Sequence, residues 1–164
     1  MCVFIAVSPY TFQTKSFIKT KKYPIHLIKT PGIDYHFDLK YIINALNLNI
    51  IMTISADLPL INSKIIDFII EKYFILKKPA LTLMANIDSF NQYGLKPTII
   101  FKTKKNEREL IPLGINIIDG RLIEQKKIEQ ITIISDQKEL LFNINTISDY
   151  YKLLSFQEKN NSEK

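Results

Sequence analysis

The chain has 164 residues, of which 46% are hydrophobic, and it carries a formal net charge of +6. This length fits one domain with its own core, and no apolar run reaches the roughly 18 residues of a membrane helix. Cys2 is the single cysteine of the chain, so it cannot form an internal disulfide. The lysines are spread along the chain without a stacking-aromatic motif, so a nucleic-acid partner ranks lowest despite the positive charge. We expect a cytoplasmic protein that binds neither nucleic acid nor membrane.

Short apolar runs alternate with amphipathic segments, which predicts an α/β fold whose sheet is mostly parallel and has helices on both faces. The first run, residues 3–7, is continuously apolar, as is typical of a strand buried on both sides. In chain order the patterns then predict a helix at 11–19, a strand at 25–28, a helix at 34–46, a strand at 50–54, a helix capped by Asn62 or Ser63, and a strand at 80–84.

Helical periodicity fades after residue 84, and strand-like runs follow. These runs predict strands at 98–101, 114–118 and 131–134, before a last helix from about 145 to 154. No linker or repeat divides the chain. We therefore expect one domain over residues 1–156 and a disordered polar tail over residues 157–164.

Asp57 follows the third predicted strand directly, in the segment Ser-Ala-Asp-Leu-Pro at 55–59. Open α/β sheets place their ligands at the carboxyl ends of the strands, and Mg²⁺ commonly bridges one carboxylate to substrate phosphates. A carboxylate that only caps its own turn is an equally good interpretation of this segment alone.

A second polar segment, Phe-Asn-Ile-Asn-Thr at 142–146, precedes Asp149 and the last predicted helix. Asn145 or Thr146 is a good N-cap, and Asp149 lies where a carboxylate stabilises the start of a helix. The functional alternative is that Asn145 approaches the same metal ion and phosphate as Asp57.

Two glycines occupy positions where a ligand or another part of the chain could come close to the backbone. Gly32, in Thr-Pro-Gly-Ile-Asp, marks a turn that could bring backbone near a base or phosphate, although Pro-Gly is first of all a turn signal. Gly114 lies inside an apolar strand, where a glycine often marks close approach of a ligand or of another backbone.

These segments, in this order, resemble the nucleotidyltransferase superfamily of molybdenum-cofactor guanylyltransferases and sugar-nucleotide pyrophosphorylases. The closer resemblance is to archaeal adenosylcobinamide-phosphate guanylyltransferases, and it covers roughly residues 3–155. Beyond the two polar segments it rests on Phe4 to Pro9 with Thr14-Lys15, Pro31-Gly32 with Tyr35 and Asp38-Leu39, Ser63 to Ile66, Ala80-Leu81 with Met84, Pro112 with Gly114 to Asn116, and Leu141 to Thr146.

The resemblance implies a Rossmann-like fold of the nucleotide-diphospho-sugar transferase type and the transfer of GMP from GTP to adenosylcobinamide phosphate with release of pyrophosphate. It implies that Asp57, assisted by Asn145, holds Mg²⁺ as the catalytic pair. It further implies nucleotide contacts that include Gly32 and Asp38 near the guanine or ribose. The full set of expected nucleotide-binding residues is Gly32, Asp38, Ser55, Ala56, Gly114 and Asn116.

Such enzymes begin with a strand and a glycine-rich loop, Gly-Gly-x-Gly-x-Arg, whose backbone N–H groups cradle the nucleotide phosphates. The four glycines here lie at 32, 94, 114 and 120, and none forms that loop. We therefore expect a chain that lacks the first strand and loop, by a wrong gene start, truncation or degeneration. Activity and inactivity of the chain as it stands both stay open as expectations. Another nucleotidyltransferase and a non-catalytic binding module stay open as alternatives, and an unpaired strand edge would favour a homodimer.

Overall fold

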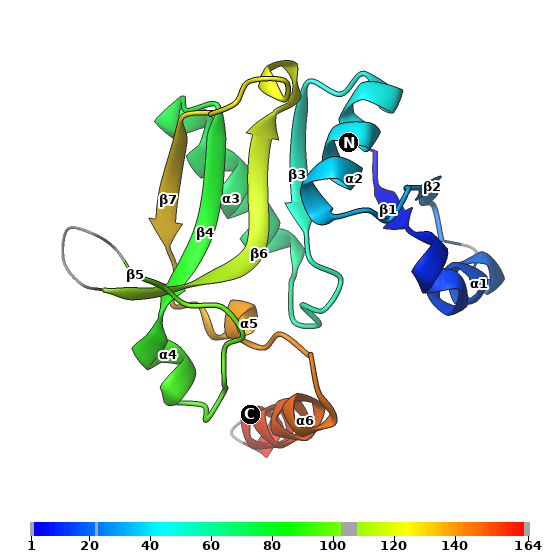
Figure 1. Ribbon diagram of the computed structural model, residues 1–164. Helices are drawn as coiled ribbons and strands as arrows, with labels where there is room; N and C mark the ends of the chain where they lie inside the picture. The colour runs from blue at the N-terminus through cyan, green and yellow to red at the C-terminus, as the bar shows by residue number, and fades with distance from the viewer. Residues whose placement is uncertain (1, 22, 103–107, 163–164) are drawn as a thin grey trace. The chain divides into compact units, whose positions relative to one another are not determined.

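The computed structural model describes residues 2–21, 23–102 and 108–162 (Figure 1). The chain forms strands and helices in alternation and divides into two compact units, Met1–Ile50 with Asp119–Lys126 and Ile51–Ile118 with Lys127–Lys164. Among the described residues, no helix is both long enough and apolar enough to cross a membrane.

The first unit holds a two-stranded parallel sheet, in which β1 (Phe4–Val7) pairs with β2 (His26–Lys29). A 3₁₀ turn (Pro9–Thr11) and α1 (Phe12–Thr20) connect these strands, α2 (Tyr35–Leu46) follows β2, and a second 3₁₀ turn spans Gly120–Leu122. The prediction of a first strand buried on both sides is wrong. Phe4 is 37% exposed, and of the four residues of β1 only Val7 is buried.

The second unit is built on a mixed sheet in the order β3-β6-β4-β7 (Figure 1). These strands are β3 (Ile50–Ile54), β6 (Glu109–Asp119), β4 (Ala80–Asn86) and β7 (Gln130–Ile134), with a short β5 (Phe101–Lys102) paired to the start of β6. β7 runs parallel to β4, whereas β6 runs antiparallel to it. The α/β class is confirmed, and the predicted strand at 98–101 is wrong except at its last residue.

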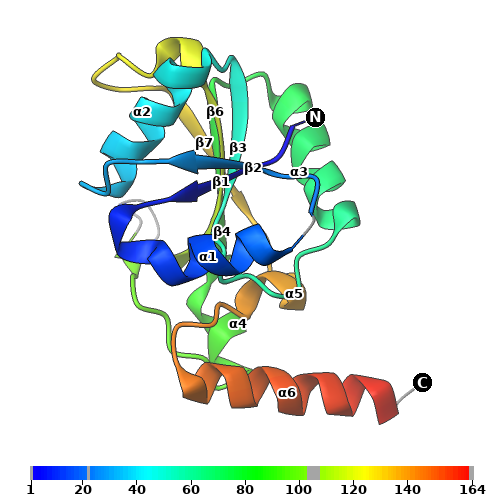
Figure 2. The same ribbon diagram turned by 90° about the vertical axis from the view of Figure 1, so that its right-hand side faces the viewer.

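The helix α3 (Ser63–Leu76) covers one face of this sheet, as Figure 2 shows. Asn62 starts it by accepting a hydrogen bond from the N–H of Ile65 at 3.1 Å, as the capping pattern predicts. Its inward residues recur every four positions and meet alternate residues of two strands, because strand side chains alternate between faces. The core made this way contains Ile65, Ile69, Tyr73, Leu81, Leu83, Ala85, Ile111, Leu113, Ile115 and Ile117.

Three further helices close the end of the sheet: α4 (Ile87–Asn91), α5 (Lys138–Leu141) and α6 (Ile147–Ser162). The ring of Phe156 on α6 packs against Phe142 and Tyr93, with centroids 4.6 and 5.8 Å away. The prediction of a disordered tail over 157–164 is wrong up to Ser162, because this aromatic contact anchors the helix beyond its expected end. Residues 163 and 164 lie outside the described residues.

Candidate active site

The first part of the site is the turn that follows β3, where Ser55 meets the middle of β6. The N–H of Ser55 donates to the carbonyl oxygen of Gly114 at 2.9 Å, and the register between β4 and β6 shifts at this level. Gly114 has a φ of +70°, and a Cβ placed there would lie 2.5 Å from Ser55 Oγ and 2.8 Å from Ser55 Cβ. Only glycine fits this close approach, and the group that approaches Gly114 is the side chain of Ser55.

The second part is the segment between α5 and α6. The N–H of Ile144 donates to the carbonyl oxygen of Asp57 at 3.0 Å, which places this segment against the turn after β3. Asp57 Oδ1 and Asn143 Oδ1 are both buried and have no hydrogen-bond partner among the described residues. A buried oxygen that accepts no hydrogen bond costs free energy, and a bound cation removes that cost.

Mg²⁺, which the family resemblance implies, fits these residues. It takes oxygen ligands and is commonly held by one or two carboxylates together with substrate phosphates. The Asp57 carboxylate and the Asn143 amide oxygen supply such ligands at the carboxyl end of a strand. Within the described ranges, no three His, Cys, Asp or Glu side chains gather into a metal site.

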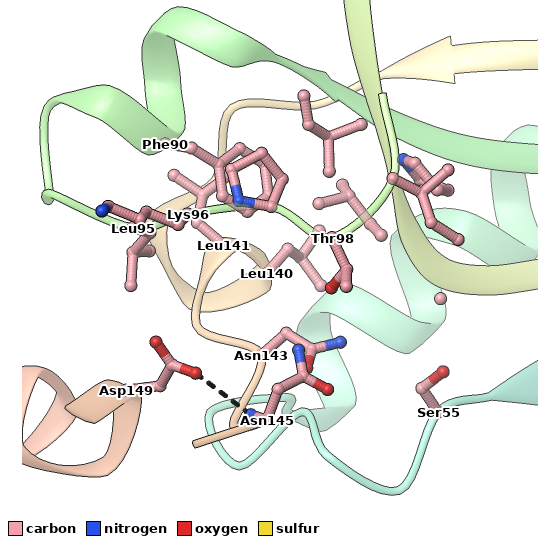
Figure 3. A pocket seen from close by; sticks show the side chains of 16 residues that line it. Ser55, Phe90, Leu95, Lys96, Thr98, Leu140, Leu141, Asn143, Asn145 and Asp149 are labelled. Atoms are coloured by element: carbon pink, nitrogen blue, oxygen red, sulfur yellow. Dashed lines mark hydrogen bonds between the residues drawn. The ribbon is translucent and has the colours of Figure 1, made fainter. Parts of the chain in front are cut away.

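A pocket of about 220 Å³ opens beside these two segments (Figure 3). Its apolar walls come from α4, α5, β6 and the segment 95–99, and they include Phe90, Leu95, Ile111, Leu113, Leu140 and Leu141. Its polar lining includes Ser55, Thr98, Asn143 and Asn145. The arrangement offers a small apolar cavity with a cluster of neutral hydrogen-bonding groups next to the turn that carries Asp57.

Asn145 and Asp149 lie at the start of α6, where they form a capping arrangement. The Asp149 carboxylate accepts hydrogen bonds from Thr146 N at 2.9 Å, from Thr146 Oγ1 at 2.8 Å and from Asn145 N at 3.3 Å. The predicted cap is therefore confirmed with Thr146 in the capping position. The side chain of Asn145 is exposed and lines the pocket, so its predicted metal role stays a prediction.

No family model matches the chain. The adenosylcobinamide-phosphate guanylyltransferase of Methanocaldococcus jannaschii is 34% identical over 152 residues, which cover 90% of this chain and 71% of that protein. The chain belongs to this guanylyltransferase family. The resemblance predicted from the ordered motifs is confirmed.

A solved structure supports the fold of this family member. The structure of CMP:2-keto-3-deoxy-manno-octonic acid synthetase in complex with CTP matches 96% of this chain and 82% of its own, with a TM-score of 0.62 and 13% identity. At that identity the likeness concerns the fold alone, and it confirms the predicted nucleotidyltransferase fold. The chain is a nucleotidyltransferase by family, and its fold agrees with that assignment.

Two further predicted residues of this guanylyltransferase-family chain come together in the first unit. The N–H of Gly32 donates to both oxygens of the Asp38 carboxylate, at 2.9 and 3.2 Å. Gly32 has a φ of +75°, and a Cβ there would lie 3.0 Å from Ser8 Cβ and 3.1 Å from Pro9 Cδ. Asp38 therefore fixes the Pro-Gly turn, and the nucleotide contacts expected of both residues stay predictions.

The remaining predicted residues differ in their surroundings. Asn116 accepts a hydrogen bond from the Thr82 hydroxyl, its register partner on β4, and it is not among the residues that line the pocket. Ser55 lines the pocket, whereas the exposed Ala56 does not. Asn143 belongs to the Phe-Asn-Ile-Asn-Thr segment, but nothing in the sequence distinguishes it as a site residue, because its buried oxygen becomes visible only once the segment lies against the turn of Asp57.

Proposed function

We propose that the chain transfers GMP from GTP to adenosylcobinamide phosphate and releases pyrophosphate. The observation that carries this proposal is a pair of buried oxygens with no hydrogen-bond partner among the described residues. One belongs to Asp57, in the turn after β3, and the other to Asn143, in the segment that contacts this turn. The relative from Methanocaldococcus jannaschii, whose name states this guanylyltransferase activity, supports the choice of acceptor.

The reaction joins two anionic reactants, so positioning and charge neutralisation dominate its catalysis. An oxygen of the acceptor phosphate attacks the α-phosphorus of GTP, a new P–O bond forms, and the bond to the departing pyrophosphate breaks. Asp57, with Asn143 and Asn145, would hold Mg²⁺, which when bound offsets the negative charge of the phosphates. The Ser55–Gly114 hydrogen bond fixes the turn on which Asp57 stands.

The test measures GMP transfer by the wild type, Asp57→Ala and Asp67→Ala. Asp67 is an exposed carboxylate on α3, so it matches the loss of charge without touching the site. We expect Asp57→Ala to lose about 10²-fold or more in rate, in line with the several kcal/mol that metal catalysis supplies. Mn²⁺ binding, followed by electron paramagnetic resonance, should weaken in the same variant and not in the control.

The assay is run on the 164-residue chain and on a version extended upstream in its reading frame. A second acceptor, the molybdenum cofactor, distinguishes the two guanylyltransferase alternatives directly. GTP binding without transfer to either acceptor would favour the non-catalytic binding module instead. Full activity of Asp57→Ala would overturn the metal assignment. The cytoplasmic location, the homodimer and the Mg²⁺ requirement stay predictions.

A further inference from the structure

The polar side chains that line the pocket beside the Asp57 turn differ between its two ends: they are charged at one end and neutral at the other. Figure 3 shows Lys96 and Asp149 on one side and Ser55 on the other, with Thr98, Asn143 and Asn145 between them. Lys96 is the one cation among the described residues that line the pocket. The end next to the catalytic turn therefore offers hydroxyl and amide groups rather than a positive charge.

The size of the pocket limits what it can take. Pockets that enclose whole small molecules begin at roughly 300 Å³. A volume of about 220 Å³ accommodates a phosphate on a short aliphatic arm, whereas the bulk of a corrinoid must stay outside. The apolar walls suit such an arm, because buried aliphatic groups gain free energy from apolar contact.

We propose that this pocket is the subsite for the phosphate-bearing arm of the acceptor, and that Thr98 binds the acceptor phosphate there. This inference rests on the proposed function and assigns a residue to it. The Thr98 side chain points toward Asn143 and Asn145 in Figure 3, so its hydroxyl faces the end where the attacking phosphate must lie. Thr98 lines the pocket from the segment before β5.

Two variants test the role of Thr98. Thr98→Val removes the hydroxyl and keeps the shape, and Thr98→Ser keeps the hydroxyl. Losing a hydrogen bond to a charged group should raise the KM for the acceptor about 10-fold or more, with the KM for GTP unchanged. Thr98→Ser should stay close to the wild type. Thr132→Val, at an exposed position on β7, is the matched control.

Propyl phosphate gives a readout that does not depend on turnover. It should bind the wild type and compete with the acceptor but not with GTP, whereas 1-propanol should not bind. Its affinity should fall about 10-fold or more in Thr98→Val.

Two results would overturn the assignment. In one, Thr98→Val behaves like Thr132→Val in both assays. In the other, Lys96→Met raises the KM for the acceptor while Thr98→Val and the control Lys64→Met, at an exposed position on α3, do not, so that the Lys96 ammonium holds the phosphate. If no version of the protein transfers GMP, the proposed function fails, and propyl phosphate binding still decides on the subsite.

Discussion

Gly114→Ala is the sharpest test of how the fold positions the turn after β3 that carries Ser55 and Asp57. Gly114 combines a φ of +70° with a position against Ser55, where a Cβ would lie 2.5 Å from Oγ and 2.8 Å from Cβ. Gly94 has a similar φ of +61°, but a Cβ there would meet no atom within 4 Å. The two glycines therefore separate backbone strain from steric conflict.

The expected losses in the free energy of unfolding follow from backbone strain and steric conflict. A left-handed conformation costs a residue with a Cβ about 1–2 kcal/mol, which both variants incur. Overpacking adds about 1–3 kcal/mol for Gly114→Ala alone, because Ser55 Cβ belongs to the turn and cannot rotate away. We expect Gly94→Ala to lower the free energy of unfolding by about 1–2 kcal/mol and Gly114→Ala by about 2–5 kcal/mol.

Urea unfolding of both variants measures this difference, and GMP transfer reports its effect on the site. Gly114→Ala should also slow transfer by up to about 10²-fold, since displacing Ser55 moves Asp57. Adding Ser55→Gly removes both conflicting atoms, so the double variant should recover part of the loss. Equal destabilisation by Gly94→Ala and Gly114→Ala would refute the argument that Gly114 is required by close approach to Ser55.

Two further predictions concern carboxylates. Asp149→Ala removes the acceptor that caps α6, so its urea midpoint should fall by the equivalent of about 1 kcal/mol, and an unchanged midpoint would show that the cap contributes nothing. The hydrogen bond from the Arg121 side chain holds the pKa of Asp119 below its ordinary value of 3.8, so the stabilisation is present above that value and is lost as the pH falls through the lowered pKa. Asp119→Asn should therefore have a lower free energy of unfolding than the wild type at pH 7. This difference in the free energy of unfolding should become smaller below about pH 4, and a difference that stays constant down to pH 2 would contradict the pairing.

Local patterns predicted the four longer helices and most strands of this fold, whereas the short helices α4 and α5 were missed. The spacing of four between Ile65, Ile69 and Tyr73 is typical of the buried face of a helix, and Asn62 was one of the two predicted caps; helix periodicity and capping are local properties. The direction of β6 was not predictable in this way. An apolar run has the same pattern whichever way the strand runs, and β6 pairs antiparallel to β4.

A site residue was predictable only where a chemically suitable side chain lies next to a recognisable helix or strand in the same short segment. Asp57 stood out because it follows a strand directly. The burial of Asn143 Oδ1 and the contact between Ser55 and Gly114 join segments far apart in the sequence, so no local pattern reveals them. The last part of α6 was not predicted as a helix because its composition is polar. In the structure, Phe156 packs against Phe142 and so attaches the helix to the core.

Nucleotidyl transfer at Asp57 is the reaction that we propose for this protein. It can be followed by incubating the protein with Mg²⁺, adenosylcobinamide phosphate and GTP labelled with ³²P at either the α or the γ position. We expect the α label to appear on the acceptor, the γ label to leave in pyrophosphate, and Asp57→Ala to slow both events about 10²-fold or more. Transfer of the γ label to the acceptor, or unchanged transfer by Asp57→Ala, would contradict this proposal.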